Sequence, residues 1–385
     1  MMTALSGGHL AVDFASGSVP ALIPFFTSRF HLSYALAGLL LLAATASSSL
    51  VQPLFGLWSD RHGALWLIPA GTLLAAVGVA GAAISPTYLL VLVLVLAGGL
   101  GVAAFHPEGA KYALFASGRK RASGMSYFNI GGNTGYALGA FVTGQLVVSF
   151  GLRATVIAMV PVAVAAAALL RLSPRFTMLA DGPRAHRTGV GEDDLGAMAL
   201  LGGVIAFRSI AWFTLLAFLP LWVESLGHSR AYANRLLFLL LLAGAFGTLV
   251  LGPVADRIGL RRTLLVTQAL VTPLTLVFIY AGGVVGALAL LPVGMCVVGT
   301  YGVTMVLSQS YLPRHVGVAS GISVGLAMGI GGVAAVALGA VADAVDLKTA
   351  LTVSALAPLL GVVGCLRLPR PAQATLVALE PAAVD

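Results

Sequence analysis

Charged side chains are scarce in this chain. Asp, Glu, Lys and Arg together make up 9% of its 385 residues, whereas 59% are hydrophobic. The mean hydropathy is +1.01. Such a chain cannot cover an apolar core with a charged surface, which excludes an ordinary water-soluble globular protein. Lipid must be its main solvent, and we expect an all-α integral membrane protein.

Cysteines and catalytic motifs are also few. Cys296 and Cys365 both fall inside apolar runs, so we expect no disulfide and no metal site. No ATP-binding loop occurs and no nucleophile stands beside a base, so we expect no cofactor and no enzymatic activity. The formal charge of +8 is spread over short loops, which argues against nucleic acid as a partner. The first apolar run lacks a basic leader and contains Asp13, so no signal peptide is expected.

Apolar runs of about 20 residues, enough to cross a bilayer core, recur along the chain. Twelve such runs lie near 5–28, 34–57, 64–84, 87–114, 122–149, 152–172, 197–224, 231–255, 262–281, 284–311, 317–342 and 347–367. A polar segment divides them into two sets of six. We therefore predict an N-terminal half at 1–172, a cytoplasmic linker at 173–196, a C-terminal half at 197–370 and a flexible tail at 371–385.

A charged motif occurs once in each half. Gly56 to Gly63 reads Gly-x-x-x-Asp-Arg-x-Gly, and the same skeleton returns 196 residues later from Gly252 to Gly259. Chance likeness between helices rich in small residues does not explain a repeated charged motif. Internal repeats in an apolar chain are typical of secondary transporters. The predicted fold is therefore twelve transmembrane helices arranged as two six-helix repeats.

The distribution of basic residues predicts the orientation in the membrane. Of the 21 Lys and Arg residues, 15 fall on the side of both termini, five fall on the opposite side, and Arg208 lies within a span. Basic residues gather in cytoplasmic loops. Both termini are therefore predicted to be cytoplasmic.

Ionisable side chains inside spanning helices are costly, so each is a candidate functional residue. His9 and Asp13 stand four residues apart in the first run and share a helix face. His106 and Glu108 flank a proline in the fourth run. The candidate proton-coupling residues are Asp13, His106 and Glu108. The candidate substrate-binding residues are His9, Asn129, Asn133 and Arg208.

Structural roles are the alternatives for the same residues. His106 and Glu108 could form an ion pair, His9 could be a buried neutral side chain, and the two asparagines could only bond helices together. Arg208 cannot be neutralised. It needs an anionic ligand or a carboxylate partner, for which Asp13 and Glu108 are available.

The repeated motif suggests a conformational latch in each half. A carboxylate at a helix end can face the positive N-terminus of a neighbouring helix, while the arginine beside it reaches another acid or a phosphate. The predicted latch residues are Asp60, Arg61, Asp256, Arg257, Arg261 and Arg262.

At these positions the chain resembles the major facilitator superfamily, whose loop signature is Gly-x-x-x-Asp-Arg-x-Gly followed by two basic residues. The first copy departs from it, because Ala64 and Leu65 replace the basic pair. More narrowly, the chain resembles the fosmidomycin-resistance branch. That likeness rests on His9-x-x-x-Asp13, Gln52-Pro53, Phe105-His106-Pro107-Glu108, Gly131-Gly132-Asn133 and the stretch from Leu312-Pro313 to Asp343.

The resemblance implies proton-driven efflux of small molecules from a bacterium, across its inner membrane, by alternating access. The namesake of the branch is a phosphonate antibiotic, so a small anionic or amphipathic substrate is expected. A proton-coupled importer of an organic anion is the first alternative, because the sequence does not determine direction. An intramembrane enzyme is a distant one. The other expected partners are protons and membrane lipid, and we expect a monomer.

Overall fold

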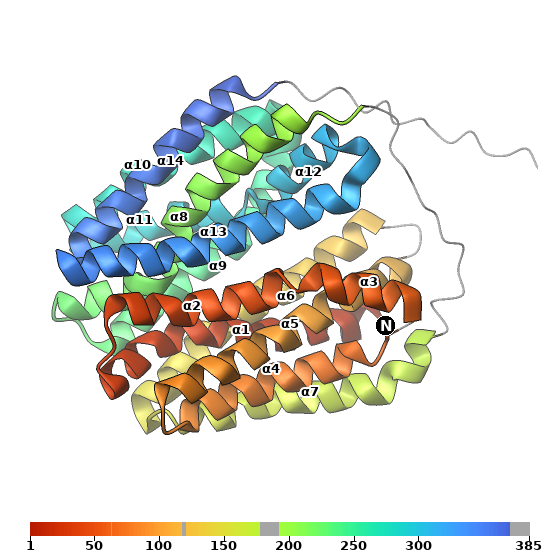
Figure 1. The fold of residues 1–385 in the computed structure, drawn as a ribbon, viewed down its shortest axis with the longest axis horizontal. Helices are drawn as coiled ribbons and strands as arrows, with labels where there is room; N and C mark the ends of the chain where they lie inside the picture. The colour runs from red at the N-terminus through yellow and green to blue at the C-terminus, as the bar shows by residue number, and fades with distance from the viewer. Residues whose placement is uncertain (63, 118–120, 178–191, 370–385) are drawn as a thin grey trace, which may run out of the picture.

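The computed structural model describes residues 1–62, 64–117, 121–177 and 192–369, and in these residues all regular structure is helical (Figure 1). The first seven helices are α1 (Met2–Phe30), α2 (Tyr34–Ser49), α3 (Gln52–His62), α4 (Leu67–Ile84), α5 (Tyr88–Ala116), α6 (Arg121–Phe150) and α7 (Ala154–Thr177). The rest are α8 (Leu195–Ser225), α9 (Arg230–Ile258), α10 (Leu260–Ala281), α11 (Gly283–Val298), α12 (Tyr301–Tyr311), the short 3-10 helix η1 (Pro313–His315), α13 (Val316–Ala344) and α14 (Leu347–Arg367).

The helices confirm the predicted fold class. Within the described residues, 11 helical stretches are long and apolar enough to cross a membrane. The remaining predicted run, 122–149, corresponds to α6, which has 30 residues but includes Asn129, Asn133 and Gln145. The predicted ends are close to the observed ones, and the run at 347–367 coincides with α14.

Two of the predicted runs are broken helices. The second span consists of α2 and α3, which are separated at Leu50 and Val51, just before Pro53. Proline has no backbone N–H to continue a helix, which accounts for the break. The tenth span consists of α11 and α12, separated at Gly299 and Thr300. Broken spans are tolerated only where other groups satisfy the freed backbone, so they mark places of interest in a membrane protein.

The helices form two groups, with α1–α7 in the lower part of Figure 1 and α8–α14 in the upper part. Helix α2 packs along α13, and α6 packs against α9. Helix α7 ends at Thr177 and α8 begins at Leu195, so most of the predicted linker, at 178–191, lies outside the described residues. The predicted tail at 371–385 lies outside them as well.

Small residues let the two groups approach closely. A Cβ on Gly38 of α2 would lie 2.6 Å from the carbonyl oxygen of Ala335, and a Cβ on Gly339 of α13 would lie 2.5 Å from that of Tyr34. The Asp343 carboxylate then accepts the backbone N–H groups of Tyr34 (2.7 Å) and Ala35 (2.9 Å) at the start of α2. These contacts join the two groups at the end of the helices that lies away from the N-terminus.

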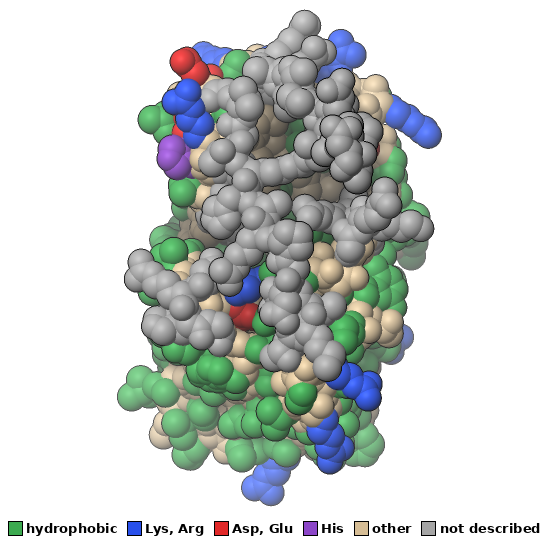
Figure 2. Space-filling view, turned by 90° about the vertical axis from the view of Figure 1, so that its right-hand side faces the viewer, with side chains coloured by type: hydrophobic (Ala, Val, Ile, Leu, Met, Phe, Trp, Pro, Cys, Tyr) green, Lys and Arg blue, Asp and Glu red, His purple; other side chains and the backbone are tan. Residues whose placement is uncertain are grey.

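The opposite end carries the N-terminus and is viewed in Figure 2. Lys and Arg side chains lie mostly around the edge of this view, and hydrophobic side chains lie between them. The second copy of the charged motif forms the last two turns of α9 and ends in the turn to α10. Its final residue, Gly259, ends α9 and precedes α10 at φ 97°, a conformation that side-chain-bearing residues avoid. This turn explains the last glycine of the motif.

Candidate functional site

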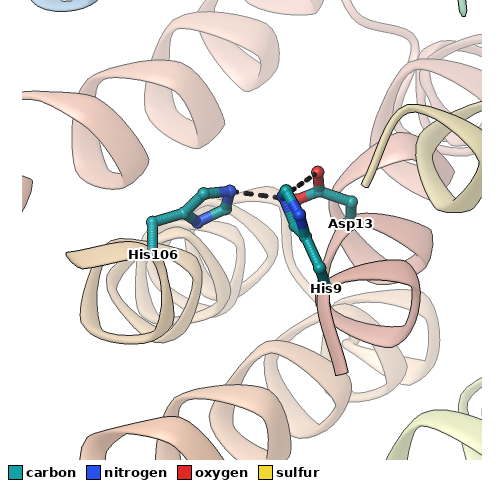
Figure 3. Close-up of side chains that lie close together, drawn as sticks. All are labelled: His9, Asp13 and His106. Carbon is teal, nitrogen blue, oxygen red and sulfur yellow. Dashed lines mark ion pairs between the residues drawn. The ribbon is translucent and has the colours of Figure 1, made fainter. Parts of the chain in front are cut away.

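Three titratable side chains meet between α1 and α5 (Figure 3). His9 and Asp13 lie one turn apart on α1, with His9 Nε2 3.2 Å from Asp13 Oδ2. His106 reaches the same carboxylate from α5, with Nε2 3.4 Å from Asp13 Oδ1. We call these residues the His–Asp–His cluster. The structure thus brings together a predicted substrate-binding residue, His9, and two predicted proton-coupling residues.

Backbone carbonyls fix how both imidazoles face the carboxylate. His9 Nδ1 lies 2.9 Å from the Phe128 oxygen, and His106 Nδ1 lies 2.8 Å from the Val102 oxygen. Because a carbonyl oxygen can only accept, each Nδ1 carries a proton and donates it. In a neutral imidazole the Nε2 lone pair then faces the Asp13 carboxylate, which is repulsive. The cluster becomes attractive only when it holds a proton or another cation.

The three side chains differ in their access to solvent. The His9 side chain is 8% exposed, that of Asp13 is 16% exposed and that of His106 is 25% exposed. His9 is enclosed by aromatic rings, with Phe128 stacked on it at 4.1 Å and Phe105 at 6.0 Å between ring centroids. His106 is therefore the side chain of the cluster through which a proton can enter most easily.

Glycine on α6 makes room for the cluster. A Cβ on Gly132 would lie 2.3 Å from His9 Nε2 and 2.7 Å from Asp13 Oδ2. Any larger residue would push the imidazole and the carboxylate from their places. On the same pair of helices, a Cβ on Gly17 would lie 2.0 Å from the Tyr136 carbonyl oxygen. Close packing of α1 on α6 therefore positions the cluster.

The cluster also has the donor set of a cation site. One nitrogen or oxygen from each of its residues lies within 4.8 Å of the other two, a spacing that could hold a metal ion. The absence of a metal site stays a prediction. The cysteine count on which it was based gave no information about histidines that meet from different helices.

Glu108 does not join this cluster, and the alternative ion pair of His106 with Glu108 does not form, because His106 lies against Asp13 and Glu108 against Lys111. Residues two apart on a helix point about 200° apart. Glu108 is instead buried, at 1% exposure, and its Oε1 accepts from Lys111 Nζ at 2.9 Å. Lys111 also donates to Ser59 Oγ of α3 at 3.1 Å. The other oxygen, Oε2, is buried and has no partner among the described residues.

Arg208 lies on α8 at 1% exposure, and of its two predicted kinds of partner the carboxylate is not found among the described residues. Among the described residues it forms no ion pair, because Asp13 contacts the two histidines and Glu108 contacts Lys111. Its Nη1 donates to Thr300 Oγ1 at 2.6 Å, and its Cζ lies 4.9 Å from the centre of the Tyr301 ring. Nε and Nη2 are buried without a partner in the part of the chain described.

The residues around Arg208 come from the break in the tenth span. Thr300 separates α11 from α12, and Tyr301 is the first residue of α12. Sequence reasoning missed both residues, although the glycine at position 299 is a signal for a break. It also missed Tyr136 on α6, three residues after Asn133. Its backbone packs against Gly17, one turn after Asp13 on α1, so this tyrosine lies next to the cluster.

The two predicted amides lie on α6. Asn129 is exposed and Asn133 is half-buried. Within the described residues, no hydrogen bond is found for either side chain. Their roles stay predictions.

The predicted latch residues lie at the ends of helices. The side chains of Asp60 and Arg61 are outside the described part of the structure. Asp256, Arg257 and Arg262 are exposed around the turn between α9 and α10. Arg261 donates its Nε to the Cys365 carbonyl oxygen at 3.1 Å and also bonds the Leu366 carbonyl at the end of α14.

Comparison with known proteins agrees with the fold. The fold is similar to that of a bacterial homologue of the human lysosomal transporter Spinster, in an inward-facing and occupied conformation. The TM-score is 0.76 with 14% identity over 95% of each chain. It is also similar to a mutant form of the nucleoside transporter NupG, with a TM-score of 0.76 and 13% identity over 95% of this chain and 99% of that one.

Two curated relatives match almost end to end. An uncharacterized MFS-type transporter of Bacillus subtilis, YfnC, is 31% identical over 93% of this chain and 90% of its own length. The fosmidomycin resistance protein of Escherichia coli is 27% identical over 94% of this chain and 91% of its own length. The sequence profile of the Major Facilitator Superfamily matches residues 5–336. The chain therefore belongs to the Major Facilitator Superfamily and is a multi-pass membrane transporter of small molecules, not an enzyme.

Proposed function

We propose that this transporter exports a small anionic or amphipathic compound in exchange for protons, by alternating access. The observation that carries the proposal is Arg208, a fully buried guanidinium with two unpartnered nitrogens and no carboxylate partner among the described residues. The relative named for fosmidomycin resistance supports export and a substrate of this type.

The geometry of Arg208 suits an anionic group. Burying an unpaired guanidinium is costly, so a protein keeps one where a ligand completes it. The bond to Thr300 and the contact with Tyr301 hold the planar fork in place. Its remaining N–H groups match the two oxygens of a carboxylate, phosphate or phosphonate.

Protons bind, in this proposal, at the His–Asp–His cluster. Both Nε2 atoms point at one carboxylate, and a shared proton turns that repulsion into a hydrogen bond. His106 exchanges the proton with water because it is the most exposed member. Glu108 is the second candidate, since one of its buried oxygens has no partner among the described residues.

Exchange requires that substrate and proton exclude each other. An anion at Arg208 alone would attract protons rather than expel them. We therefore propose that the substrate carries a hydrogen-bond donor in addition to its anionic group, and that this donor reaches Asp13 in place of the proton. Tyr136, whose backbone packs on Gly17 one turn beyond Asp13, can guide such a two-ended molecule.

The alternative is import of an organic anion together with protons. It is favoured because an anion bound at Arg208 attracts protons. The two modes differ in net charge movement. Exchange of one proton for one monovalent anion moves two charges, each worth about 2.3 kcal/mol per 100 mV of membrane potential. Joint import moves none. A potassium diffusion potential therefore drives export and leaves joint import unchanged.

The two groups of helices, the membrane and the two amides of α6 also have roles in the proposal. Residues 1–172 and 197–370 act as two rocking halves joined by the linker at 173–196, with the tail at 371–385 outside both. The protein works as a monomer in a bacterial inner membrane with both termini in the cytoplasm. Asn129 and Asn133 contribute polar contacts to the substrate.

Replacing Arg208 tests the anion site. Arg208→Lys keeps the charge but loses the planar fork, so binding of a compound that the wild-type protein binds, with fosmidomycin tried first, should weaken. Arg208→Ala should weaken binding about 30-fold or more, the effect of removing a buried charge partner. Calorimetry in detergent measures both.

Two controls separate binding from stability. Arg235 on α9 is exposed, so Arg235→Ala should bind like the wild-type protein. Arg208→Met should not lower the melting temperature, because replacing a buried unpaired charge by an apolar side chain is neutral or stabilising. Normal binding by Arg208→Ala would remove this residue from the site, and a much less stable Arg208→Met would assign it a structural role.

Replacing the carboxylates tests proton coupling. In liposomes, a substrate gradient should drive proton movement in the opposite direction through the wild-type protein. Asp13→Asn should still exchange substrate for substrate but should lose the proton movement. Glu108→Gln shows whether the second acid is also required. A chelator in all solutions excludes a contribution from a metal ion at the cluster.

A glycine pair on the neighbouring helices provides a matched control. Gly132→Ala keeps every titratable group but displaces the cluster, so it should reduce the proton movement. Gly7→Ala on α1 should not, because a Cβ there meets nothing within 4 Å. Proton movement at the wild-type rate in both Asp13→Asn and Glu108→Gln would contradict the coupling proposal.

The latches form, we propose, when the cytoplasmic end closes. Asp256 is exposed and makes no ion pair with the described residues in this conformation. Asp256→Asn should therefore disfavour the opposite, outward-open state by up to about fivefold, the effect of one exposed ion pair. A cysteine at Asn234, which is 1% exposed against α6, reports opening of the outer end through its labelling rate. An unchanged rate together with normal transport would count against the latch.

A further inference from the structure

A hollow of about 330 Å³ lies at the end of the helices opposite the N-terminus. Arg29 at the end of α1, residues 83–84 at the end of α4 and residues 150–153 between α6 and α7 line it. It is remote from the His–Asp–His cluster, because Asp13 is 16 residues before Arg29 on the same helix, about 24 Å away. Nothing in the transport proposal uses it.

The hollow is positively charged, and none of the residues that line it is acidic. Arg29 and Arg153 both line it. Residues 1–172 contain only three acids, Asp13, Asp60 and Glu108, and none of them is near this end of the helices in the chain order. By contrast Arg230, at the same end of the other group of helices, pairs with Glu224 at 3.0 Å.

One of the two arginines is held in place. Arg29 Nη1 donates to the Ala83 carbonyl oxygen at 3.2 Å, and its guanidinium lies 5.1 Å from the centre of the Phe30 ring. In the described chain no other bond of Arg29, and no side-chain bond of Arg153, is found. Most of the N–H donors of both guanidinium groups therefore remain available to an external acceptor.

Apolar side chains stand beside these donors. Phe150 is 74% exposed and Ile84 is 55% exposed. Both lie at helix ends, where the headgroup region of a bilayer meets its acyl chains. A ligand that fits must therefore have an anionic head and an apolar body.

We propose that this hollow binds the phosphate headgroup of an anionic phospholipid, with Arg29 and Arg153 on the phosphate and Phe150 and Ile84 against the acyl chains. Arginine pairs with phosphate through two parallel hydrogen bonds. Basic pockets between transmembrane helices are known sites for anionic lipid headgroups. Basic residues on this side also run against the general preference for the cytoplasmic side, and a lipid ligand accounts for them.

A purely structural explanation competes with this one. Arginines near the carboxyl ends of helices stabilise the last carbonyl groups, and the bond from Arg29 to Ala83 is such a contact. This explanation covers Arg29 but not Arg153, and it requires no lipid. Arg153→Gln is therefore the cleaner substitution.

Native mass spectrometry of the purified protein tests the site with phosphatidylglycerol and phosphatidylethanolamine supplied in equal amounts. The wild-type protein should retain phosphatidylglycerol preferentially. Arg153→Gln should reduce that preference several-fold, and Arg29→Gln with Arg153→Gln should abolish it. Arg235→Gln, which removes an exposed arginine outside the hollow, should leave it unchanged. Melting temperatures without added lipid show that each variant is folded.

Two further arms decide the outcome. Inorganic phosphate at the same concentration should not displace the lipid, because it lacks the apolar part; displacement would show a simple anion site instead. An unchanged preference for phosphatidylglycerol in the folded double variant would overturn the proposal and leave the structural explanation.

Discussion

The cost of placing charge in lipid governs the arrangement of this protein. Each ionisable group within the spans must be satisfied by a partner or by a ligand. The Asp13 carboxylate lies against two histidines, and one oxygen of Glu108 forms an ion pair with Lys111. Arg208 is the exception, with two buried nitrogens that no described residue satisfies. Arg208 lies on one half and the His–Asp–His cluster, the proposed proton site, lies on the other, so the proposed transport involves both halves.

Glycine and broken helices make this arrangement possible. Gly132 leaves the space that the His–Asp–His cluster occupies, and a Cβ there would collide with two of its side chains. The break at Thr300 supplies the hydroxyl that holds Arg208. Gly38 and Gly339 bring α2 and α13 together at the end away from the N-terminus. Packing without a hydrophobic driving force favours such residues in membranes.

The spans could be predicted from the sequence because hydropathy and length directly determine what can cross a bilayer. His9, Asp13, His106, Glu108 and Arg208 could also be selected as candidate site residues, since charge is rare in such helices. The residues that they contact could not be predicted. His106 and Glu108 are neighbours in sequence but point to opposite sides of α5, and the meeting of His106 with Asp13 depends on how α5 packs on α1. The role of Gly132 likewise depends on a contact between α6 and α1.

The sign of proton exchange on substrate binding tests the central claim most directly. Titration calorimetry in two buffers of different ionisation enthalpy gives the number of protons released or taken up per bound molecule. Competition for Asp13 predicts that the wild-type protein releases protons when substrate binds and that Asp13→Asn releases none. Proton uptake by the wild-type protein would contradict export by exchange and would favour import of the anion together with protons.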